Sequence, residues 1–207
     1  EIQIIVPEGE WVSFPYNISL RDGVLAISHF SNSQDEYTAL VQIYHWSEKD
    51  GVWQHVQEIN LNDINQAAVG ASEIVLDGER MLVFWGPLNS SASAKSDILI
   101  FKQGKDGFFE LEQNLDFPFW EFPETLEGGY CRADIDGDRL VVMDYGEWSD
   151  PNGYEHGPNG IWTYAYNENL SQWEYEQELV DDIQGILEPS WQEVAIAGDL
   201  VFSQSNI

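Results

Sequence analysis

An internal repeat constrains the fold of this chain more than any other feature of its sequence. One short pattern, an apolar residue, a tight turn and a second apolar run, occurs four times at a spacing of roughly sixty residues. Its copies read LRDGVLAI at 20–27, LDGERMLV at 76–83, IDGDRLVV at 135–142 and IAGDLVFS at 196–203. A period of this length indicates a repeat architecture in which each unit packs against its neighbours.

A second pattern alternates with the first. It consists of an aromatic strand, a polar loop and a strand of the form aromatic-x-x-x-Gln-x-aliphatic, and it spans residues 41–59, 98–115 and 161–179. In alignment, its columns contain Trp53, Phe109 and Trp173, then Gln57, Gln113 and Gln177, then Ile59, Leu115 and Leu179. The period-two alternation of Tyr, Trp, Val and Ile indicates half-buried strands, and the Asp-Gly and Gly-Asp pairs favour tight turns. Both patterns are therefore predicted to be β-hairpins.

Two hairpins make a unit of four strands, which is the blade of a β-propeller. No segment has the periodicity of an amphipathic helix of three turns. We therefore predict an all-β fold, a β-propeller of four-stranded antiparallel blades, with approximate repeats 1–39, 40–95, 96–158 and 159–207. The hairpins make about three and a half blades, whereas closed propellers have roughly four to eight. We therefore expect a segment of a larger propeller, or a propeller that another chain completes.

The segments at 41–59 and 74–83 resemble the FG-GAP-type repeats of secreted and cell-surface β-propellers, which are related to those of integrin α chains. The family's Phe-Gly has counterparts in Val69-Gly70 and Gly128-Gly129, and its Gly-Ala-Pro end in Trp85-Gly86-Pro87. The resemblance covers nearly the whole chain. It implies the propeller architecture that the repeat also predicts.

The strongly negative charge excludes some classes of partner. With 8 Lys and Arg against 37 Asp and Glu, the formal net charge is −29. Nucleic-acid binding needs a basic surface, and an anionic membrane repels such a chain, so neither partner is expected. Membrane insertion is not expected either, because no apolar run approaches the roughly 20 residues of a membrane span.

The sequence also suggests a compartment. Asn-x-Ser sequons occur at Asn17, Asn89 and Asn169, and Cys131 is the single cysteine. The sequence starts without Met and without a signal-like segment, which suggests a removed leader or a trimmed chain. We predict an extracellular or secretory and lumenal location.

Alternating aspartates around Gly137 have the appearance of a calcium loop, with the candidate ligands Asp134, Asp136 and Asp138. A calcium loop requires glycine at its sixth position, where this sequence has Arg139, and its later carboxylates are missing as well. In the repeat alignment, the column of Asp134 contains Ser19, Val75 and Ala195. We therefore predict a hairpin turn here, and neither calcium nor another cofactor.

The third aromatic strand is strongly acidic. Regular alternation would place Glu174, Glu176 and Glu178 on one face, and Trp173, Tyr175, Gln177 and Leu179 on the other. A carboxylate ladder of this kind could bind cations or a basic partner. We favour a solvated outer strand whose charge prevents pairing with other sheets.

Two long loops, 116–130 and 145–160, are rich in aromatic residues, Pro and Gly, which is typical of recognition surfaces. The candidate partner-binding residues are Phe117, Trp120, Trp148, Tyr154 and His156. The first loop could equally fill space between blades.

No nucleophile elbow, phosphate loop or carboxylate pair stands out, so no catalytic residue is predicted. We predict a non-enzymatic binding or scaffolding module that recognises a protein or glycan through its inter-blade loops. One alternative is a glycosidase-like propeller hydrolase with its active site in blades beyond this sequence. The other is an accessory structural subunit of a large assembly.

Overall fold

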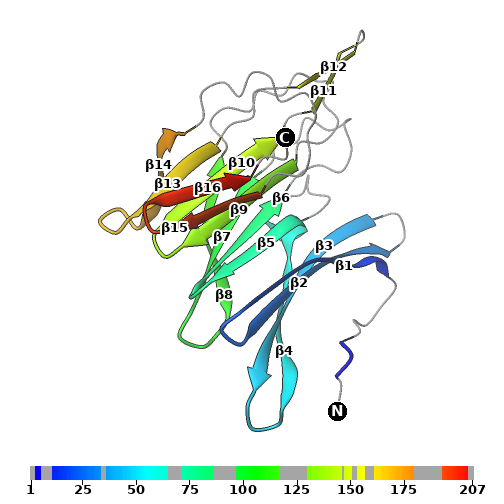
Figure 1. Ribbon diagram of the computed structural model, residues 1–207. Coiled ribbons are helices and arrows are strands. Elements are labelled where there is room, and N and C mark those ends of the chain that lie inside the picture. The colour runs from blue at the N-terminus through cyan, green and yellow to red at the C-terminus, as the bar shows by residue number, and fades with distance from the viewer. Residues whose placement is uncertain are drawn as a thin grey trace.

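The computed structural model describes residues 3–5, 11–33, 36–64, 71–85, 97–116, 130–145, 147–150, 153–156, 161–179 and 193–204. These residues form three four-stranded antiparallel sheets and two separate hairpins (Figure 1). The first sheet contains β1 (Trp11–Arg21), β2 (Val24–Ser33), β3 (Glu36–Ser47) and β4 (Val52–Asn60). The second contains β5 (Ala71–Asp77), β6 (Arg80–Trp85), β7 (Asp97–Gln103) and β8 (Phe109–Asp116). The third contains β9 (Tyr130–Asp136), β10 (Arg139–Tyr145), β13 (Ile161–Asn167) and β14 (Gln172–Glu178).

The remaining elements are short. β11 (Glu147–Asp150) pairs with β12 (Gly153–His156), and β15 (Glu193–Ala197) pairs with β16 (Leu200–Gln204). A 3-10 helix, η1 (Leu61–Asp63), follows β4, and the Asn60 side chain accepts a hydrogen bond from its first turn. Within the described ranges, no helix has the length and apolar character needed to cross a membrane.

Each sheet runs from an inner strand to an outer strand in chain order. The inner strands are adjacent, with β1 against β5, β5 against β9, and β9 against β15. Figure 1 shows the sheets following one another from the blue first sheet to the red hairpin. Sheets that succeed each other around adjacent inner strands have the blade arrangement of a β-propeller, which confirms the predicted fold class. The hairpin β15–β16 occupies the place of the inner half of a fourth sheet.

The core lies between successive sheets, because neighbouring residues of a strand point to opposite faces. On β6, Val83 packs towards the first sheet and Leu82 towards the third, and both are fully buried. A smaller cluster that includes Val141 and Ile196 joins the third sheet to β15–β16. Burial of each such side chain stabilises the fold by about 1.5–3 kcal/mol.

The inner hairpins turn on two residues, as the sequence predicted. Gly78, Gly137 and Gly198 have φ values of 54°, 60° and 57°, in the left-handed region that glycine tolerates best. The first hairpin differs, because Asp22 takes this position with a φ of 49° and Gly23 follows it. Asp enters the left-handed region more readily than most residues. Gly23 also has a positive φ, of 76°, whereas Glu79, Asp138 and Asp199 do not, so the first turn differs from the other three in backbone geometry as well as in sequence.

The sheets are offset from the repeats proposed from sequence. The boundary at 39/40 falls inside β3, and the boundary at 158/159 falls between β12 and β13. The proposed boundaries therefore fall within a sheet, near the change from its inner to its outer hairpin. Both hairpin patterns recur with the same period, so the period alone does not show at which of them a sheet begins.

Candidate functional site

The predicted recognition loops lie largely outside the described residues. Phe117 and Trp120 belong to the undescribed range 117–129. Trp148, Tyr154 and His156 lie on the hairpin β11–β12, where Trp148 pairs with Glu155 and Tyr154 with Ser149. The backbone of this hairpin is described, whereas its side chains are not. These five residues remain candidates from sequence.

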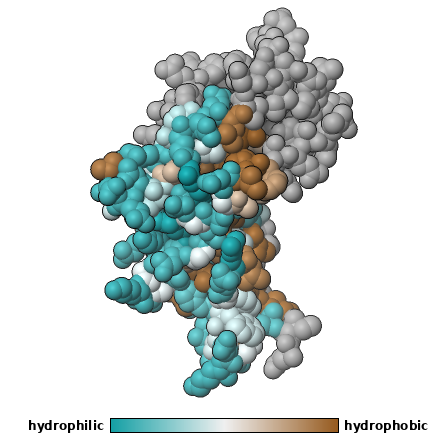
Figure 2. Space-filling model, turned by 60° about the vertical axis from the view of Figure 1, so that its left-hand side comes forward, coloured by the Kyte–Doolittle hydropathy of each residue, from teal (hydrophilic) through white to brown (hydrophobic). Residues whose placement is uncertain are grey.

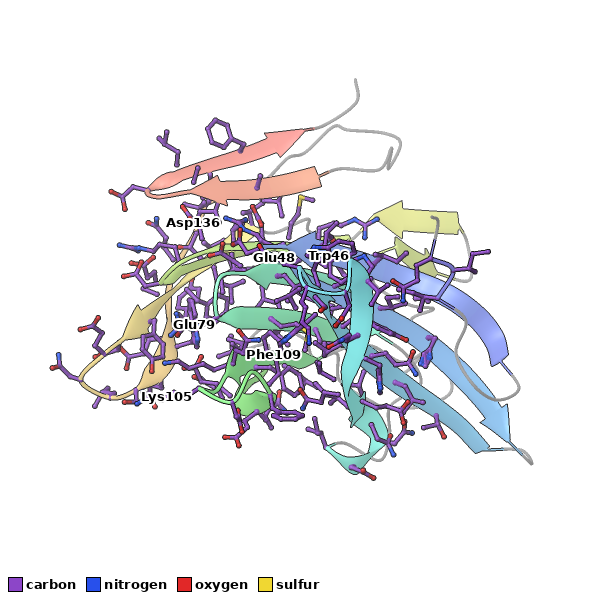
Figure 3. All side chains as sticks on the ribbon, turned by 90° about the horizontal axis from the view of Figure 1, so that it is seen from below. Trp46, Glu48, Glu79, Lys105, Phe109 and Asp136 are labelled. Carbon is purple, nitrogen blue, oxygen red and sulfur yellow. The ribbon has the colours of Figure 1, made fainter. Side chains whose placement is uncertain are left out.

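Two of the three aspartates of the candidate calcium loop accept hydrogen bonds from backbone amides. Asp134 Oδ2 accepts a hydrogen bond from the Ile196 N–H at 3.0 Å, and Asp136 Oδ2 accepts one from the Gly198 N–H at 2.7 Å. Asp136 lies beside the turn of β15–β16 (Figure 3). Asp138 lies in the exposed turn of its own hairpin. Among the described residues, no group of three or more His, Cys, Asp or Glu side chains is placed to hold a metal.

Hydrogen bonds of this kind, from a backbone N–H to a side chain of the preceding inner strand, join each pair of neighbouring inner strands in the described part of the chain. Asn17 and Ser19 accept hydrogen bonds from the N–H groups of Ile74 and Leu76, each at 3.1 Å. Between β5 and β9, Glu73 accepts from the Ala133 N–H and Asp77 from the Gly137 N–H. We call these contacts inner clasps. They satisfy backbone amides that face away from the sheet ladder, which would otherwise be costly to bury.

A second set of contacts, the glutamine clasps, joins the outer strands. Gln57 Nε2 donates to the Phe109 carbonyl at 2.8 Å, and its Oε1 accepts from the Phe109 N–H at 2.7 Å. Gln113 makes the same two bonds to Trp173, at 3.1 and 2.6 Å. Gln3 makes them to Trp53, at 2.9 and 2.7 Å. The aligned glutamine and aromatic columns therefore bond to each other from one sheet to the next.

A repeated β-bulge makes this possible. In the first sheet the register moves from Ile43↔Gln57 to Tyr44↔His55, so Val56 has no partner. Register shifts at the same place leave Glu112 and Glu176 without a paired residue on the neighbouring strand in the other two sheets. An extra residue reverses the face on which the following side chains lie. The aromatic residue therefore faces the preceding sheet and the glutamine faces the next one. The prediction that Trp173 and Gln177 share a face was wrong for this reason.

Arg80 occupies the centre of the outer interface between the second and third sheets. Its Nε lies 3.0 Å from Glu112 Oε2, and its Nη1 donates to the Gly137 carbonyl at 3.0 Å. Its guanidinium lies 4.4 Å from the ring centre of Tyr166 and 5.1 Å from that of Trp173. Such cation–π contacts contribute about 0.5–2 kcal/mol each.

The third sheet repeats this arrangement on its far side. Arg139 pairs with Glu176, which raises the pKa of the arginine, and it also lies 3.8 Å from Asp199 in the turn of β15–β16. The neighbouring Gln177 pairs with Thr163 in the sheet, and its exposed side chain makes no hydrogen bond in the described part of the chain. We call Arg139, Glu176 and Gln177 the outer edge of the third sheet.

The first sheet exposes an apolar surface at the opposite end of the stack. Ile18 and Leu20 of β1 are 53% and 62% exposed, and Tyr16 lies beside them. Residues in the same columns of the next sheet, Ile74 and Leu76, are each 4% exposed. We call Tyr16, Ile18 and Leu20 the first-sheet face. On β16, Leu200 and Phe202 are exposed in the same way. Figure 2 shows hydrophobic side chains gathered along one side of the described sheets, with hydrophilic residues covering most of the rest.

A buried polar group in the first sheet escaped prediction. Tyr44 Oη donates to Gln42 Oε1 at 2.8 Å, and Gln42 Nε2 donates to Glu58 Oε2 at 3.1 Å. Burial lowers the pKa of the nearby His29 to about 4, although Glu58 opposes this shift. Burial also raises the pKa of Tyr44. The sequence signal was Gln42 itself, a polar residue in a column that contains Leu99 and Trp162 elsewhere.

Comparisons with known proteins place the chain in no family. No family model matches it, and no curated protein matches it. Among solved structures, it is similar to the periplasmic gluconolactonase of Pseudomonas aeruginosa, with 11% identity, a TM-score of 0.46, and coverage of 88% of this chain and 61% of that one. It is also similar to a protein with unknown function from Bacteroides fragilis NCTC 9343, with 12% identity, a TM-score of 0.30, and coverage of 76% and 70%. This chain thus spans less than two thirds of the gluconolactonase.

Proposed function

We propose that this chain is a non-enzymatic β-propeller module that binds a protein partner through the first-sheet face. The observation that carries the proposal is the first-sheet face, where Ile18 and Leu20 are exposed while their counterparts in the next sheet are buried. Ile18 and Leu20 are apolar like the residues of a sheet-to-sheet interface, but no sheet covers them in the described part of the chain. Exposed apolar groups of this kind mark interaction sites in folded proteins.

The use of the polar side chains also favours binding over catalysis. Asp77 lies on the inner strand β5, and Asp134 and Asp136 lie on the inner strand β9, where a propeller enzyme could hold catalytic acids. Each of them accepts a hydrogen bond from a backbone amide of the next inner hairpin, either in its first strand (Ile196) or in its turn (Gly137 and Gly198). A carboxylate held in this way has a structural role, because it joins one sheet to the next.

A protein fits the first-sheet face better than a glycan does. Aliphatic side chains such as Ile18 and Leu20 gain from desolvation against other apolar groups, whereas sugars present mainly hydroxyls. The acidic surface around the sheets would favour a partner with basic residues at the rim of the contact. We propose that this binding takes place outside the cell or in a secretory compartment. Asn169, in the exposed β13–β14 turn, is a sequon with room for a glycan there.

Photo-crosslinking tests the proposal. A benzophenone amino acid at Tyr16 should crosslink to a protein of the native source, which is then purified and measured by calorimetry against the unlabelled chain. We expect Leu20→Asp to weaken binding at least about tenfold, because a buried charge without a partner is costly. Leu170→Asp is the matched control, since Leu170 is 58% exposed in a distant turn.

Two results would contradict the proposal. One is a crosslinked protein that binds the wild type and Leu20→Asp equally well. The other is a preparation that binds only immobilised glycans or that turns over lactone and glycoside substrates.

A further inference from the structure

The turn between β13 and β14 contains a sequon whose acceptor side chain is free. Asn169, Leu170 and Ser171 form the triplet Asn-x-Ser, and all three residues are exposed. Within the described ranges, the Asn169 side chain makes no hydrogen bond, because the one bond recorded at this residue comes from its backbone N–H. Figure 1 shows this turn at the outer margin of the third sheet, away from β1.

The turn keeps its shape without the Asn169 side chain. Asn167 Oδ1 accepts hydrogen bonds from the backbone N–H groups of Asn169 and Leu170, at 3.1 and 3.4 Å. Asn167 Nδ2 donates to Glu174 Oε2 at 2.8 Å, which ties the turn to β14. Asn167 therefore makes the side-chain contacts to backbone that stabilise a turn of this kind, and the side chain of Asn169 has no part in them.

The corresponding turns of the other two sheets each contain a structural polar residue and no sequon. Between β3 and β4, Ser47 Oγ donates to Asp50 Oδ2 at 2.8 Å. Between β7 and β8, Asp106 Oδ1 accepts a hydrogen bond from the Phe108 N–H at 3.2 Å. Residues 47–52 and 104–108 include no Asn. Among these three outer turns, the third therefore differs in having an asparagine that the turn does not use.

The sequon in β1 is used by the fold. Asn17 Oδ1 and Ser19 Oγ accept hydrogen bonds from the backbone of β5, so both polar side chains of this triplet belong to the inner clasps. Asn17 is half-buried where β1 packs against β5. A sugar on its Nδ2 would have to fit beside these two packed strands. Asn89, in the third sequon, lies outside the described residues.

We propose that Asn169 is a site of N-linked glycosylation and that Asn17 is not glycosylated in the folded protein. The donor is an oligosaccharide linked to a lipid pyrophosphate, and an oligosaccharyl transferase of the secretory route catalyses the transfer. Asn169 Nδ2 forms a bond to the anomeric carbon, the bond from that carbon to the pyrophosphate oxygen breaks, the lipid pyrophosphate leaves, and one Nδ2 proton is lost to a base. This inference rests on the proposed location outside the cell or in a secretory compartment.

A glycan on Asn169 is compatible with the stacking of the sheets. The packed interface ends at Trp173, which is 2% exposed, whereas the turn that precedes it is exposed. N-linked glycans are bulky and solubilising, so they occupy surface positions of this kind and not packed strands. The first-sheet face lies in another part of the molecule, so the glycan leaves the proposed partner site open (Figure 1).

Peptide mapping tests this inference on the full chain isolated from its native source and on the chain secreted by a eukaryotic host. Glycans are released with peptide N-glycosidase in heavy-oxygen water, which converts each glycosylated Asn to Asp and adds one heavy oxygen. We expect this label at Asn169 in the majority of molecules and no label at Asn17. In the secreting host, Asn169→Gln should abolish the label at this position and leave the urea midpoint of the deglycosylated chain unchanged, because Gln is not an acceptor and the turn does not use this side chain.

Two substitutions in the same turn separate the sequon from the exposure of the turn. Ser171 has a φ of 53°, which glycine adopts readily, so Ser171→Gly should preserve the fold and abolish the glycan because the hydroxyl is lost. Leu170→Ala, at the middle position of the triplet, is the matched control and should keep the glycan. An unlabelled Asn169, a glycan that survives Ser171→Gly, or label at Asn17 equal to that at Asn169 would each overturn the inference.

The outcomes separate this inference from the proposed function. A chain without sugar at Asn169 that binds its partner and loses binding in Leu20→Asp would preserve the proposed protein binding and overturn the inference. A chain glycosylated at Asn169 whose partner binds the wild type and Leu20→Asp equally well would do the reverse.

Discussion

The interface between the first and second sheets and the interface between the second and third share their backbone contacts and differ in their side chains. Both contain a glutamine clasp, from Gln57 in one and from Gln113 in the other. Around the first clasp, Val24 and Val56 pack on an apolar cluster that includes Phe109. Around the second, Arg80 and Glu112 take the columns of these two valines and surround Trp173.

The difference shows which part of the interface is fixed. A clasp bonds to the N–H and C=O groups that any residue possesses except proline, which lacks the N–H. It therefore tolerates either an ion pair or two valines beside it. The bulge and the glutamine set the geometry of the joint, and the neighbouring side chains are free to vary.

The largest effect on the free energy of unfolding is expected from replacing the aromatic residues to which the glutamine clasps bond. Trp173→Ala should lower the free energy of unfolding by about 3–5 kcal/mol, because a large buried side chain is lost and a cavity remains. Phe109→Ala should cost a similar amount, with Trp173→Ala the greater because Arg80 and Glu112 also lose a contact. Urea unfolding measures both. A smaller cost for Trp173→Ala than for Phe109→Ala would show that the ionic surroundings add nothing.

The next prediction converts one interface into the other. Arg80→Val alone should cost about 3 kcal/mol, because Glu112 stays largely buried without its main partner. The double substitution Arg80→Val with Glu112→Val should lie within about 1 kcal/mol of the wild type, since it recreates the pair Val24 and Val56. A double-mutant cycle with urea unfolding checks this. Equal costs for the single and double variants would mean that the two interfaces are not interchangeable.

The clasps themselves should have nearly equal effects in both interfaces. Gln57→Ala and Gln113→Ala should each lower the free energy of unfolding by about 1–3 kcal/mol, because each leaves a part-buried N–H and C=O unpaired. Gln54→Ala, on the exposed side of β4, should change it by less than about 0.5 kcal/mol. If only one of the two variants were destabilised, the bonds from glutamine to the backbone would not stabilise both interfaces alike.

The smallest effect concerns the first sheet, which differs from the other two in its buried histidine. The pKa of His29 is about 4 in the folded protein and 6.5 in the unfolded chain. Between these values the unfolded chain binds more protons, so stability should fall as the pH drops from 6.5 towards 4. His29→Asn should weaken this pH dependence, as seen in urea midpoints at pH 7 and pH 5. Glu58, whose negative charge acts on His29, remains in both proteins. If His29→Asn had the same pH dependence of stability as the wild type, that dependence would come from the carboxylates and not from His29.

The sequence predicted the hairpins because turn geometry leaves a direct mark on it. Gly78, Gly137 and Gly198 occupy the left-handed positions that a two-residue turn requires. The aligned glutamines and aromatic residues were also visible, although their purpose was not. Their function depends on the bulge, whose extra residue is Val56 in one sheet and glutamate in the other two. No residue type marks that position, so a regular strand was the natural and wrong assumption.

The candidate site was less accessible to sequence reasoning than the fold. The spacing around Gly137 was sufficient to argue against calcium, but it could not show that Asp134 and Asp136 bond to β15 and the turn that follows it. Such contacts join residues about sixty positions apart, and one sequence records no pairing over that distance. The loop residues Phe117 and Trp120 lie outside the described ranges and remain predictions.

The bulge also gives each sheet a front and a back. The glutamine points forward and the aromatic residue points backward, so two sheets join in one order only. A gene segment that encodes one such sheet could be duplicated in tandem, and its product would fit its neighbours without a newly evolved contact. The number of sheets could then change during evolution while the joint stayed the same. Divergence would be confined to the side chains around the clasp, which is where the two complete interfaces of this chain differ.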